Sequence, residues 1–577
     1  MTHLRIFFVS VLALFSVAAA QDTELPFCTE HTERVALYTI QGSELLSPYN
    51  GETVHTYGVV TATFYGRNQP GGFFVQDPVG DNDPATSDAI FVRHRSGDLP
   101  EVGNFVEFAG RIVERDHFTA AERVTDLVVC GDMPLPEPTV LRLPVASQAE
   151  LEAAEGMLVT FEQPLIITEV YDLGRYGRMA LADERLFIPE QQEDEPAVPN
   201  ALRRIVLDDT FTTENIAPTP YLGADGNPPR AGDSVVHLVG VLASESGDVY
   251  RVEPTEEVVF ERTNPRPAPP NVRGSGNEEA TLVIAGFNAY NFFTDLYGRG
   301  PSTVAEQERQ TAKLVAAITQ LDADIIGFME IENDGGISLE RLKNAVNEAL
   351  GEEQYAVVHT GTLGTDAITQ AALYRPAVVQ PRVVHALHDN AVHDRPPLGV
   401  VFERFDGERV VVVVGHFKSK GSCPAAGDTD RGFGCWNLRR AAQASSVAEL
   451  AAALGELANT EHLVVVGDLN SYGNEPPINV LRDAGWIDLG QEWLDSAERY
   501  SYVFMGEFGT LDYALVSPEL APHVTGFAYW HINADEPRAF DYSTQWNLPE
   551  SYQPNEFRSS DHDPAVFGIE LPLLPRN

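Results

Sequence analysis

The chain is poor in basic residues. Lysine and arginine together number 39, against 85 aspartate and glutamate residues, which gives a formal net charge of −46. Such a charge opposes long-range attraction of any polyanion, so a polyanionic ligand would have to be held by local basic contacts and metal ions. An acidic surface that only aids solubility is the alternative explanation. Hydrophobic residues make up 43% of the 577 residues, which excludes a disordered chain and predicts several domains.

Long apolar runs are absent beyond the first residues of the chain. The run from Ile6 to Val17 follows Arg5 and precedes three alanines, and it is shorter than the ~20 apolar residues that a membrane-spanning helix needs. This pattern predicts a cleaved signal peptide over residues 1–20, with a membrane anchor as the alternative. We therefore expect a secreted protein, extracellular or periplasmic, that does not associate with membranes.

Cysteine is scarce, since the chain has four: Cys28, Cys130, Cys423 and Cys435. Export places them in an oxidising compartment, where they are expected to pair. Cys28 and Cys130 flank the first predicted domain, and the other two flank a short loop, so we favour pairing within each couple. A zinc site is the alternative, but no CxxC spacing supports it.

The first half of the chain is rich in predicted β-strands. Short runs of alternating polar and apolar residues, such as GVVTATF and GGFFVQD, predict an OB-fold-like β domain over residues 21–135. Its aromatic residues, among them Tyr57, Phe73 and Phe74, are candidates for stacking on single-stranded nucleic acid or for the core. A second β-rich domain is expected over residues 136–263, followed by a proline-rich linker over residues 264–280.

Residues 281–577 alternate apolar strands with amphipathic helices, which predicts an α/β domain. Its apolar strand runs are bordered by polar residues that can bind a metal or move a proton. Side chains at strand ends can converge on one rim of a sheet. In chain order these residues are Asn288, Glu330, Tyr374, Arg375, His416, Lys418, Asp468, Asn470, Asp512, Asp561 and His562.

This ordered set resembles the endonuclease/exonuclease/phosphatase superfamily, whose DNase I-like members carry an early Asn, a Glu after a strand, GDxN and a closing SDH. Over nearly the whole chain the sequence is similar to the ExeM-type bacterial extracellular nucleases. The matching segments include MEIEN, HFKSKGSC, CWNLRR, FGTLDYALVSPELAP, HINADEP and FRSSDHDP. The resemblance implies a four-layer α/β sandwich with the active site at one edge of two packed sheets.

Hydrolysis of a phosphodiester needs a base for the attacking water, charge neutralisation on the phosphoryl oxygens and stabilisation of the departing oxygen. Oxygen ligands suit Mg²⁺ or Mn²⁺, and we predict Asn288, Glu330 and Asp561 as the metal ligands. Ca²⁺ is a further candidate ion, for example at Asp77–Asp88, where a solvated turn is the better explanation because the loop lacks a complete EF-hand pattern.

His562 is the predicted general base, with Asp512 accepting a hydrogen bond from its other ring nitrogen. His416 is predicted to protonate the departing oxygen or to stabilise it together with metal. However, the strand QAALYRP lacks the carboxylate that DNase I-like enzymes usually place there, so no residue is assigned to orient His416. Asp468 and Asn470 share a turn and are predicted to face the phosphate, an ordinary Asx-turn being the alternative.

A local positive strip is expected to contact the phosphate backbone, with solvated surface side chains as the alternative. Its candidate members are Tyr374, Arg375, Lys418, Asn437 and Arg440.

The predicted function is that of a secreted, monomeric, metal-dependent nuclease that hydrolyses DNA, or RNA, with little sequence specificity. The first alternative is a phosphodiesterase or phosphatase of the same superfamily with a substrate other than nucleic acid, because a fold does not settle the substrate. The second is a non-catalytic binding protein on a degenerate scaffold, which the complete set of catalytic residue types disfavours.

Overall fold

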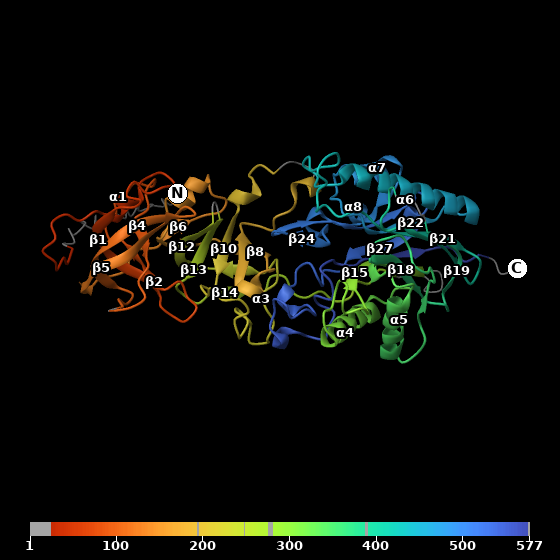
Figure 1. The fold of residues 1–577 in the computed structure, drawn as a ribbon. Coiled ribbons are helices and arrows are strands. Elements are labelled where there is room, and N and C mark those ends of the chain that lie inside the picture. The colour runs from red at the N-terminus through yellow and green to blue at the C-terminus, as the bar shows by residue number, and fades with distance from the viewer. Residues whose placement is uncertain are drawn as a thin grey trace, which may run out of the picture.

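The computed structural model describes residues 25–574, except residues 98, 193–195, 247–248, 275–280 and 387–390. The predicted signal peptide, residues 1–20, lies outside the described residues. The molecule is elongated, with a small barrel at one end, a broad sheet in the middle and layered sheets and helices at the other end (Figure 1). None of the described helices has both the length and the apolar character that crossing a bilayer demands.

The N-terminal unit is a closed barrel with the strand order β1-β2-β3-β5-β4. Strands β3 and β5 pair in parallel, and the other neighbours pair antiparallel. The disulfide between Cys28 and Cys130 ties the start of the described chain to β5, as predicted. The elements are α1 (Leu37–Gln41), β1 (Thr53–Phe64), β2 (Gly72–Gln76), β3 (Ala89–Val92), β4 (Asn104–Arg115) and β5 (Phe118–Asp132).

The aromatic residues of β2 lie in the interior of the molecule. Phe73 is buried in the barrel core, and Phe74 is buried between the barrel and the following sheet. Phe73 and Phe74 are therefore core residues. Their burial excludes the alternative role of stacking on a ligand. In the loop Asp77–Asp88, the carboxylates of Asp77, Asp81 and Asp83 accept backbone N–H groups two residues further on, which makes ordinary Asx-turns.

The middle unit is a nine-stranded sheet with the order β14-β11-β8-β9-β10-β13-β12-β7-β6. One of its faces packs an apolar core around Phe161, Leu181 and Val252. The elements are β6 (Thr139–Leu141), α2 (Gln148–Glu152), β7 (Leu158–Phe161), β8 (Leu165–Glu169), α3 (Leu173–Tyr176), β9 (Arg178–Ala182), β10 (Arg204–Asp208), β11 (Ser234–Val236), β12 (Leu238–Ser246), β13 (Val249–Pro254) and β14 (Val259–Glu261).

The C-terminal unit contains two six-stranded sheets. The first has the order β17-β18-β16-β15-β28-β27 and is built from β15 (Thr281–Phe292), β16 (Ile325–Glu332), β17 (Ala356–Val357), β18 (Ile368–Tyr374), β27 (Val524–Tyr529) and β28 (Ala565–Glu570). The second has the order β19-β20-β21-β22-β26-β23 and is built from β19 (Val379–Ala386), β20 (Leu398–Arg404), β21 (Arg409–His416), β22 (Leu463–Asp468), β23 (Ile487–Asp488) and β26 (Asp512–Val516).

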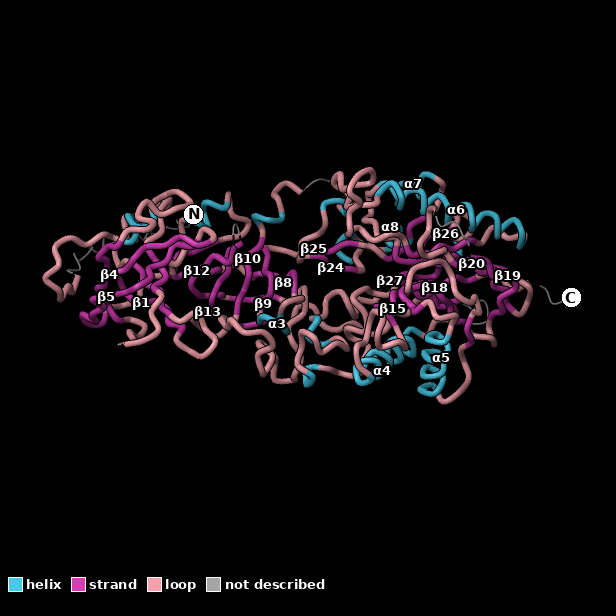
Figure 2. Tube along the Cα trace, viewed as in Figure 1, coloured by secondary structure: helices cyan, strands magenta, loops and turns pink. Residues whose placement is uncertain are grey.

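The two sheets pack face to face through aliphatic side chains such as Ile284, Val414 and Val466. The outer face of the first sheet is covered by α4 (Val304–Leu321) and α5 (Ile337–Leu350), and that of the second by α6 (Asn437–Ala458) and α7 (Pro476–Asp483), with α8 (Leu489–Trp493) beside them (Figure 2). Apolar residues on these helices supply the two outer cores, and α4 and α6 lie where the sequence predicted helices. The result is the four-layer arrangement expected for residues 281–577.

A short hairpin, β24 (Tyr502–Phe504) and β25 (Glu507–Gly509), connects the C-terminal unit to the middle sheet. The Thr168 hydroxyl donates to the Gly506 carbonyl, and Arg204 donates to the Met505 carbonyl at 2.8 Å. The backbones of β25 and residues 186–188 also exchange hydrogen bonds. The hairpin is therefore held between the two units.

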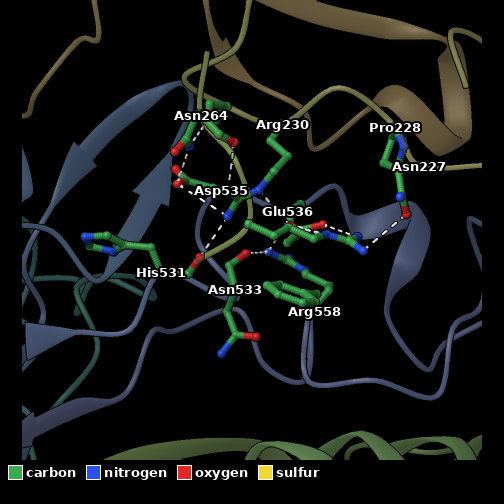
Figure 3. A network of polar contacts seen from close by, with 12 residues as sticks. Asn227, Pro228, Arg230, Asn264, His531, Asn533, Asp535, Glu536 and Arg558 are labelled. Carbon is green, nitrogen blue, oxygen red and sulfur yellow. Dashed lines mark hydrogen bonds and ion pairs between the residues drawn. The ribbon is translucent and has the colours of Figure 1, made fainter. Parts of the chain in front are cut away.

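Buried ion pairs join the same two units (Figure 3). Arg230, from the loop before β11, lies 2.7 Å from Glu536 and donates to the His531 carbonyl at 2.8 Å. Two residues of the segment predicted as a linker also contact the C-terminal unit. Asn264 donates to Asp535 at 2.7 Å, and Arg266 donates to Glu536 at 2.8 Å. Residues 264–266 thus lie against the C-terminal unit.

Replacing Arg230 by Met should destabilise the protein strongly. The change leaves the buried Glu536 carboxylate with one partner fewer, and breaking a buried pair in this way costs about 3–5 kcal/mol. Urea unfolding followed by tryptophan fluorescence measures the effect, because Trp530 is buried next to His531.

The matched control is Arg382→Met. Arg382 also pairs with a glutamate, Glu403, at 2.7 Å, but its side chain is 55% exposed. Removing such a surface pair costs about 1 kcal/mol or less. Equal losses in the two variants would show that the interface does not depend on the buried pair.

Candidate active site

Strand register brings the central site residues together at one edge of the two sheets. His416, the last residue of β21, is paired with Asp468, the last residue of β22. Asp468 is in turn paired with Asp512, the first residue of the antiparallel strand β26. On the facing sheet, Asn288 of β15 is paired with Met329, the residue before Glu330 on β16. Asp561 and His562 precede β28, which begins at Ala565 beside Gly286.

The close approach of β21 and β22 requires glycine. Gly467 has a φ of +147°, and a Cβ atom at this position would lie 1.9 Å from the carbonyl oxygen of Gly415. Since no side chain fits there, Gly467 is needed to place Asp468 beside His416.

Glu330 lies in an irregular stretch of β16. Its φ is +61°, and the register with β18 shifts between Phe328 and Ile331. Such a bulge redirects a side chain, and here it turns Glu330 toward the cleft while its carboxylate accepts the Asn291 N–H at 2.9 Å. Burial, reinforced by the nearby charge of Asp561, raises the pKa of Glu330 to about 7.

His562 and Asp512 form a hydrogen-bonded pair. Nδ1 of His562 lies 2.7 Å from Oδ2 of Asp512, which also accepts the Ser501 hydroxyl at 2.8 Å. The ring of Tyr502, on β24, packs on the imidazole with 4.6 Å between the centroids. Burial opposes the imidazolium form, but the carboxylates of Asp512, Asp468 and Asp561 outweigh it and raise the pKa of His562 well above its usual value.

His416 is buried beside a guanidinium that the sequence did not reveal as a site residue. Arg395 donates to Nε2 of His416 at 3.0 Å and also to the Phe417 carbonyl. Burial and this cation lower the pKa of His416 to about 4, so its imidazole is neutral near neutral pH. Nε2 is therefore a hydrogen-bond acceptor in this structure, which does not favour the proton-donating role predicted for His416.

Asp468 connects the two sheets. Its Oδ2 lies 3.3 Å from Nε2 of His416 and 3.4 Å from the amide nitrogen of Asn288, while Oδ1 accepts the Asn470 N–H at 2.9 Å. The hydrogen bond from the Asn470 N–H to Asp468 is the Asx-turn that was the alternative explanation for these two residues. The turn is therefore present, and both residues also line the cleft. Burial opposes ionisation of Asp468, but the charge of His562 holds its pKa at about 2.

Hydrogen bonds from Asn533 hold the loop that carries Asp561 and His562. The Asn533 side chain donates to the His562 carbonyl and accepts the backbone N–H groups of Ser559 and Ser560. Asn533 belongs to the same segment as Asp535 and Glu536, which pair with the middle unit (Figure 3). The site loop and the interface therefore share one support.

These residues surround a cleft of about 770 Å³. The predicted site residues that line it are Glu330, His416, Asp468, Asn470, Asp561 and His562. Asn288 and Asp512 lie behind this wall, each 1% exposed, and contact Asp468 and His562 respectively. Arg395, Lys420 and Tyr502 also line the cleft and were missed.

The predicted phosphate contacts are not gathered there. Tyr374 pairs with Ile325 at the start of β16, so it lies with Arg375 at the opposite edge of the sheet, where Arg375 pairs with Asp322. The prediction took the carboxyl end of β18 as the site edge, but β18 runs antiparallel to β16 and ends away from the site.

Of the other three predicted contacts, Arg440 and Lys418 are engaged within the protein, and Asn437 is not among the residues that line the cleft. Arg440 is 0% exposed and donates to the carbonyls of Phe433, Cys435 and Lys418, so it cannot reach a phosphate. The Lys418 ammonium pairs with Asp394 at 3.3 Å. Asn437 begins α6, next to the predicted Cys423–Cys435 disulfide, which the structure contains.

The donor set of the cleft fits a hard divalent cation. The carboxylates of Glu330 and Asp561 face the same cleft, and their mutual repulsion contributes to the raised pKa of Glu330. A cation between them would relieve this repulsion, and carboxylate oxygens are the ligands that Mg²⁺ and Mn²⁺ use. Asn288 is a less direct fit, because its amide nitrogen already donates to Asp468 and its oxygen accepts the Tyr290 N–H at 3.0 Å.

Replacing Glu330 by Gln should have opposite effects with and without metal. Without metal, stability should hold or rise, because the variant no longer buries a carboxylate whose ionised form is disfavoured. With Mn²⁺ in excess, the wild type should gain about 2.7 kcal/mol at a hundredfold excess over Kd, and the variant should lose most of this gain.

Urea unfolding with and without Mn²⁺ measures both effects, and Glu352→Gln, at an exposed glutamate, is the control. If the Glu330→Gln variant kept the full gain in stability from Mn²⁺, Glu330 would not be a metal ligand.

Comparison with known proteins agrees with this geometry. Residues 285–562 match the profile of the Endonuclease/Exonuclease/phosphatase family. No curated protein matches the chain.

Several solved structures are similar to the C-terminal half. An endonuclease/exonuclease/phosphatase family protein from Bacteroides thetaiotaomicron is 17% identical over 50% of this chain and 97% of its own, with a TM-score of 0.35. A mannosyl-6-phosphatase from the same organism is 17% identical over 50% of this chain and 98% of its own, with a TM-score of 0.34. The catalytic domain of human Nocturnin is 14% identical over 50% and 94%, with a TM-score of 0.32. Residues 285–562 are thus a domain of the endonuclease/exonuclease/phosphatase family.

Proposed function

We propose that the protein is a secreted nuclease of the ExeM type that hydrolyses phosphodiester bonds of extracellular DNA, with RNA as a further substrate, using Mg²⁺ or Mn²⁺. Members of the matched family are hydrolases of phosphodiesters or phosphate esters and generally depend on divalent metals. The observation that carries the proposal is the His562–Asp512 pair, 2.7 Å apart, beside the Glu330 and Asp561 carboxylates in one open cleft.

In this proposal His562 is the general base for the attacking water. Asp512 accepts the Nδ1–H of the imidazole, which fixes the tautomer and turns Nε2 toward the cleft. The Ser501 hydroxyl holds Asp512 in turn. A divalent cation held by Glu330 and Asp561 would neutralise charge on the phosphoryl and departing oxygens and would lower the pKa of His562.

In this proposal Arg395 is the main phosphate contact, in place of the positive strip that the sequence predicted. Its guanidinium lines the cleft and has further N–H donors beyond those given to His416 and Phe417. His416 then acts as the acceptor that orients Arg395, and Asn470 faces the same phosphate. A buried guanidinium is suited to phosphoryl oxygens because its donors form a rigid fork.

The proposal extends to the N-terminal units. We propose that the barrel β1–β5 is an OB-fold, supported by its five strands in the order β1-β2-β3-β5-β4. We also propose the domain limits 21–135, 136–263 and 281–577, supported by a barrel whose strands span 53–132, a nine-stranded sheet whose strands span 139–261 and layered sheets whose strands span 281–570. Export agrees with the two disulfides. The protein is proposed to act as a monomer.

The purified full-length protein should cleave plasmid DNA in the presence of Mg²⁺ or Mn²⁺ and stop when EDTA is added. His562→Ala should lower kcat by about 10²-fold or more, because the general base is lost. Gel analysis of circular and linear DNA, with initial rates from a fluorescent oligonucleotide, measures both effects.

His359→Ala is the control, since the His359 side chain is 81% exposed and is not among the residues that line the cleft. If the protein hydrolysed a lipid or sugar phosphate and left DNA intact, the substrate assignment would be wrong. If His562→Ala kept the wild-type rate, the base would be misplaced.

A further inference from the structure

A second cleft adjoins the candidate active site. Its volume is about 540 Å³, within the range of roughly 300–1,000 Å³ that is usual for ligand pockets. Tyr502, Phe504 and Asp561 line both clefts, so the two clefts lie next to each other at the proposed metal site. The middle unit also contributes to its lining, with Glu169, the last residue of β8, and Tyr171, which follows this strand.

Two exposed aromatic rings face this second cleft from different units. Tyr171 of the middle unit is 49% exposed, and Phe504 of the β24–β25 hairpin is 53% exposed. Exposed aromatic rings that line one cavity offer surfaces on which a planar ligand can stack.

Both walls are fixed in place. The guanidinium of Arg538 lies 5.0 Å from the centre of the Tyr171 ring and donates to its hydroxyl. The hairpin that carries Phe504 is tied to the middle unit by Thr168 and Arg204. Preorganised walls lower the entropy lost when a flat ligand is bound between them.

The charged groups that line this cleft are mostly engaged within the protein. Glu536 is paired with Arg230 and Arg266, and Arg538 lies near Asp541 and donates to Tyr171. Arg558 donates to the Asn533 and Glu536 carbonyls. The carboxyl group of Glu169 also lines the cleft, and the N–H groups of a nucleobase could donate to its oxygens.

We propose that this second cleft binds one unpaired nucleobase of the nucleotide next to the scissile phosphodiester, stacked against Tyr171 and Phe504. The inference rests on the proposed nuclease function and specifies its substrate. A base can enter only when it has left the duplex stack, so single strands are cleaved faster than duplexes of the same sequence. The middle unit is thereby part of the substrate site.

The test compares two single-stranded oligonucleotides of equal length, one with all its bases and one abasic throughout, with the full-length protein and Mn²⁺. Because stacking of one base strengthens binding, the kcat/KM of the wild type should be about tenfold or more higher for the base-bearing strand than for the abasic strand. Tyr171→Ala and Phe504→Ala should each reduce this ratio toward one.

The control variant is Phe405→Ala, at an exposed aromatic in the turn between β20 and β21, on the edge away from the site. It should keep both the ratio and the rates. A ratio that Tyr171→Ala and Phe504→Ala leave unchanged, or equal losses on both strands, would overturn the nucleobase site. Equal wild-type rates on both strands would overturn it while leaving the nuclease proposal intact, and a wild type that cleaves no nucleic acid would remove both.

Discussion

The candidate site depends on the register of three neighbouring strands. Because β21, β22 and β26 pair without a shift at their ends, His416, Asp468 and Asp512 lie side by side, and Gly467 permits the close approach that this needs. Asp512 then receives His562 from the loop before β28. A shift of one residue in β22 would turn Asp468 to the other face of its sheet and separate the two histidines.

This register brings several buried carboxylates close together. A buried carboxylate is stable in its charged form only when it has a hydrogen-bonding partner or a cation beside it. Asp512 has His562 as its partner, and Asp468 accepts the Asn470 N–H and lies in the field of His562. Glu330 has one backbone N–H and the repulsion of Asp561. The acidic balance of the whole chain agrees with a substrate held by local contacts, since a net charge of −46 repels nucleic acid at a distance.

Strand and helix periodicity, which is a local signal, predicted an α/β domain over residues 281–577, and the family resemblance implied its four layers. The positions of the cysteines around the first domain and around one loop predicted both disulfides. The sequence also named the eight residues from Asn288 to His562 that the structure gathers. It failed at Tyr374 and Arg375, where the direction of β18 decides which end reaches the site, and at Arg440, whose burial depends on α6 packing. Arg395 precedes β20 and was missed because only residues bordering the chosen strand runs were considered.

The proposed chemistry requires a divalent cation between Glu330 and Asp561. Anomalous diffraction from crystals of the full-length protein soaked in Mn²⁺ locates such an ion. We expect one strong peak within coordination distance of carboxylate oxygens of both residues. A peak confined to another acidic stretch, such as the Asp77–Asp88 loop, with none between Glu330 and Asp561, would contradict it.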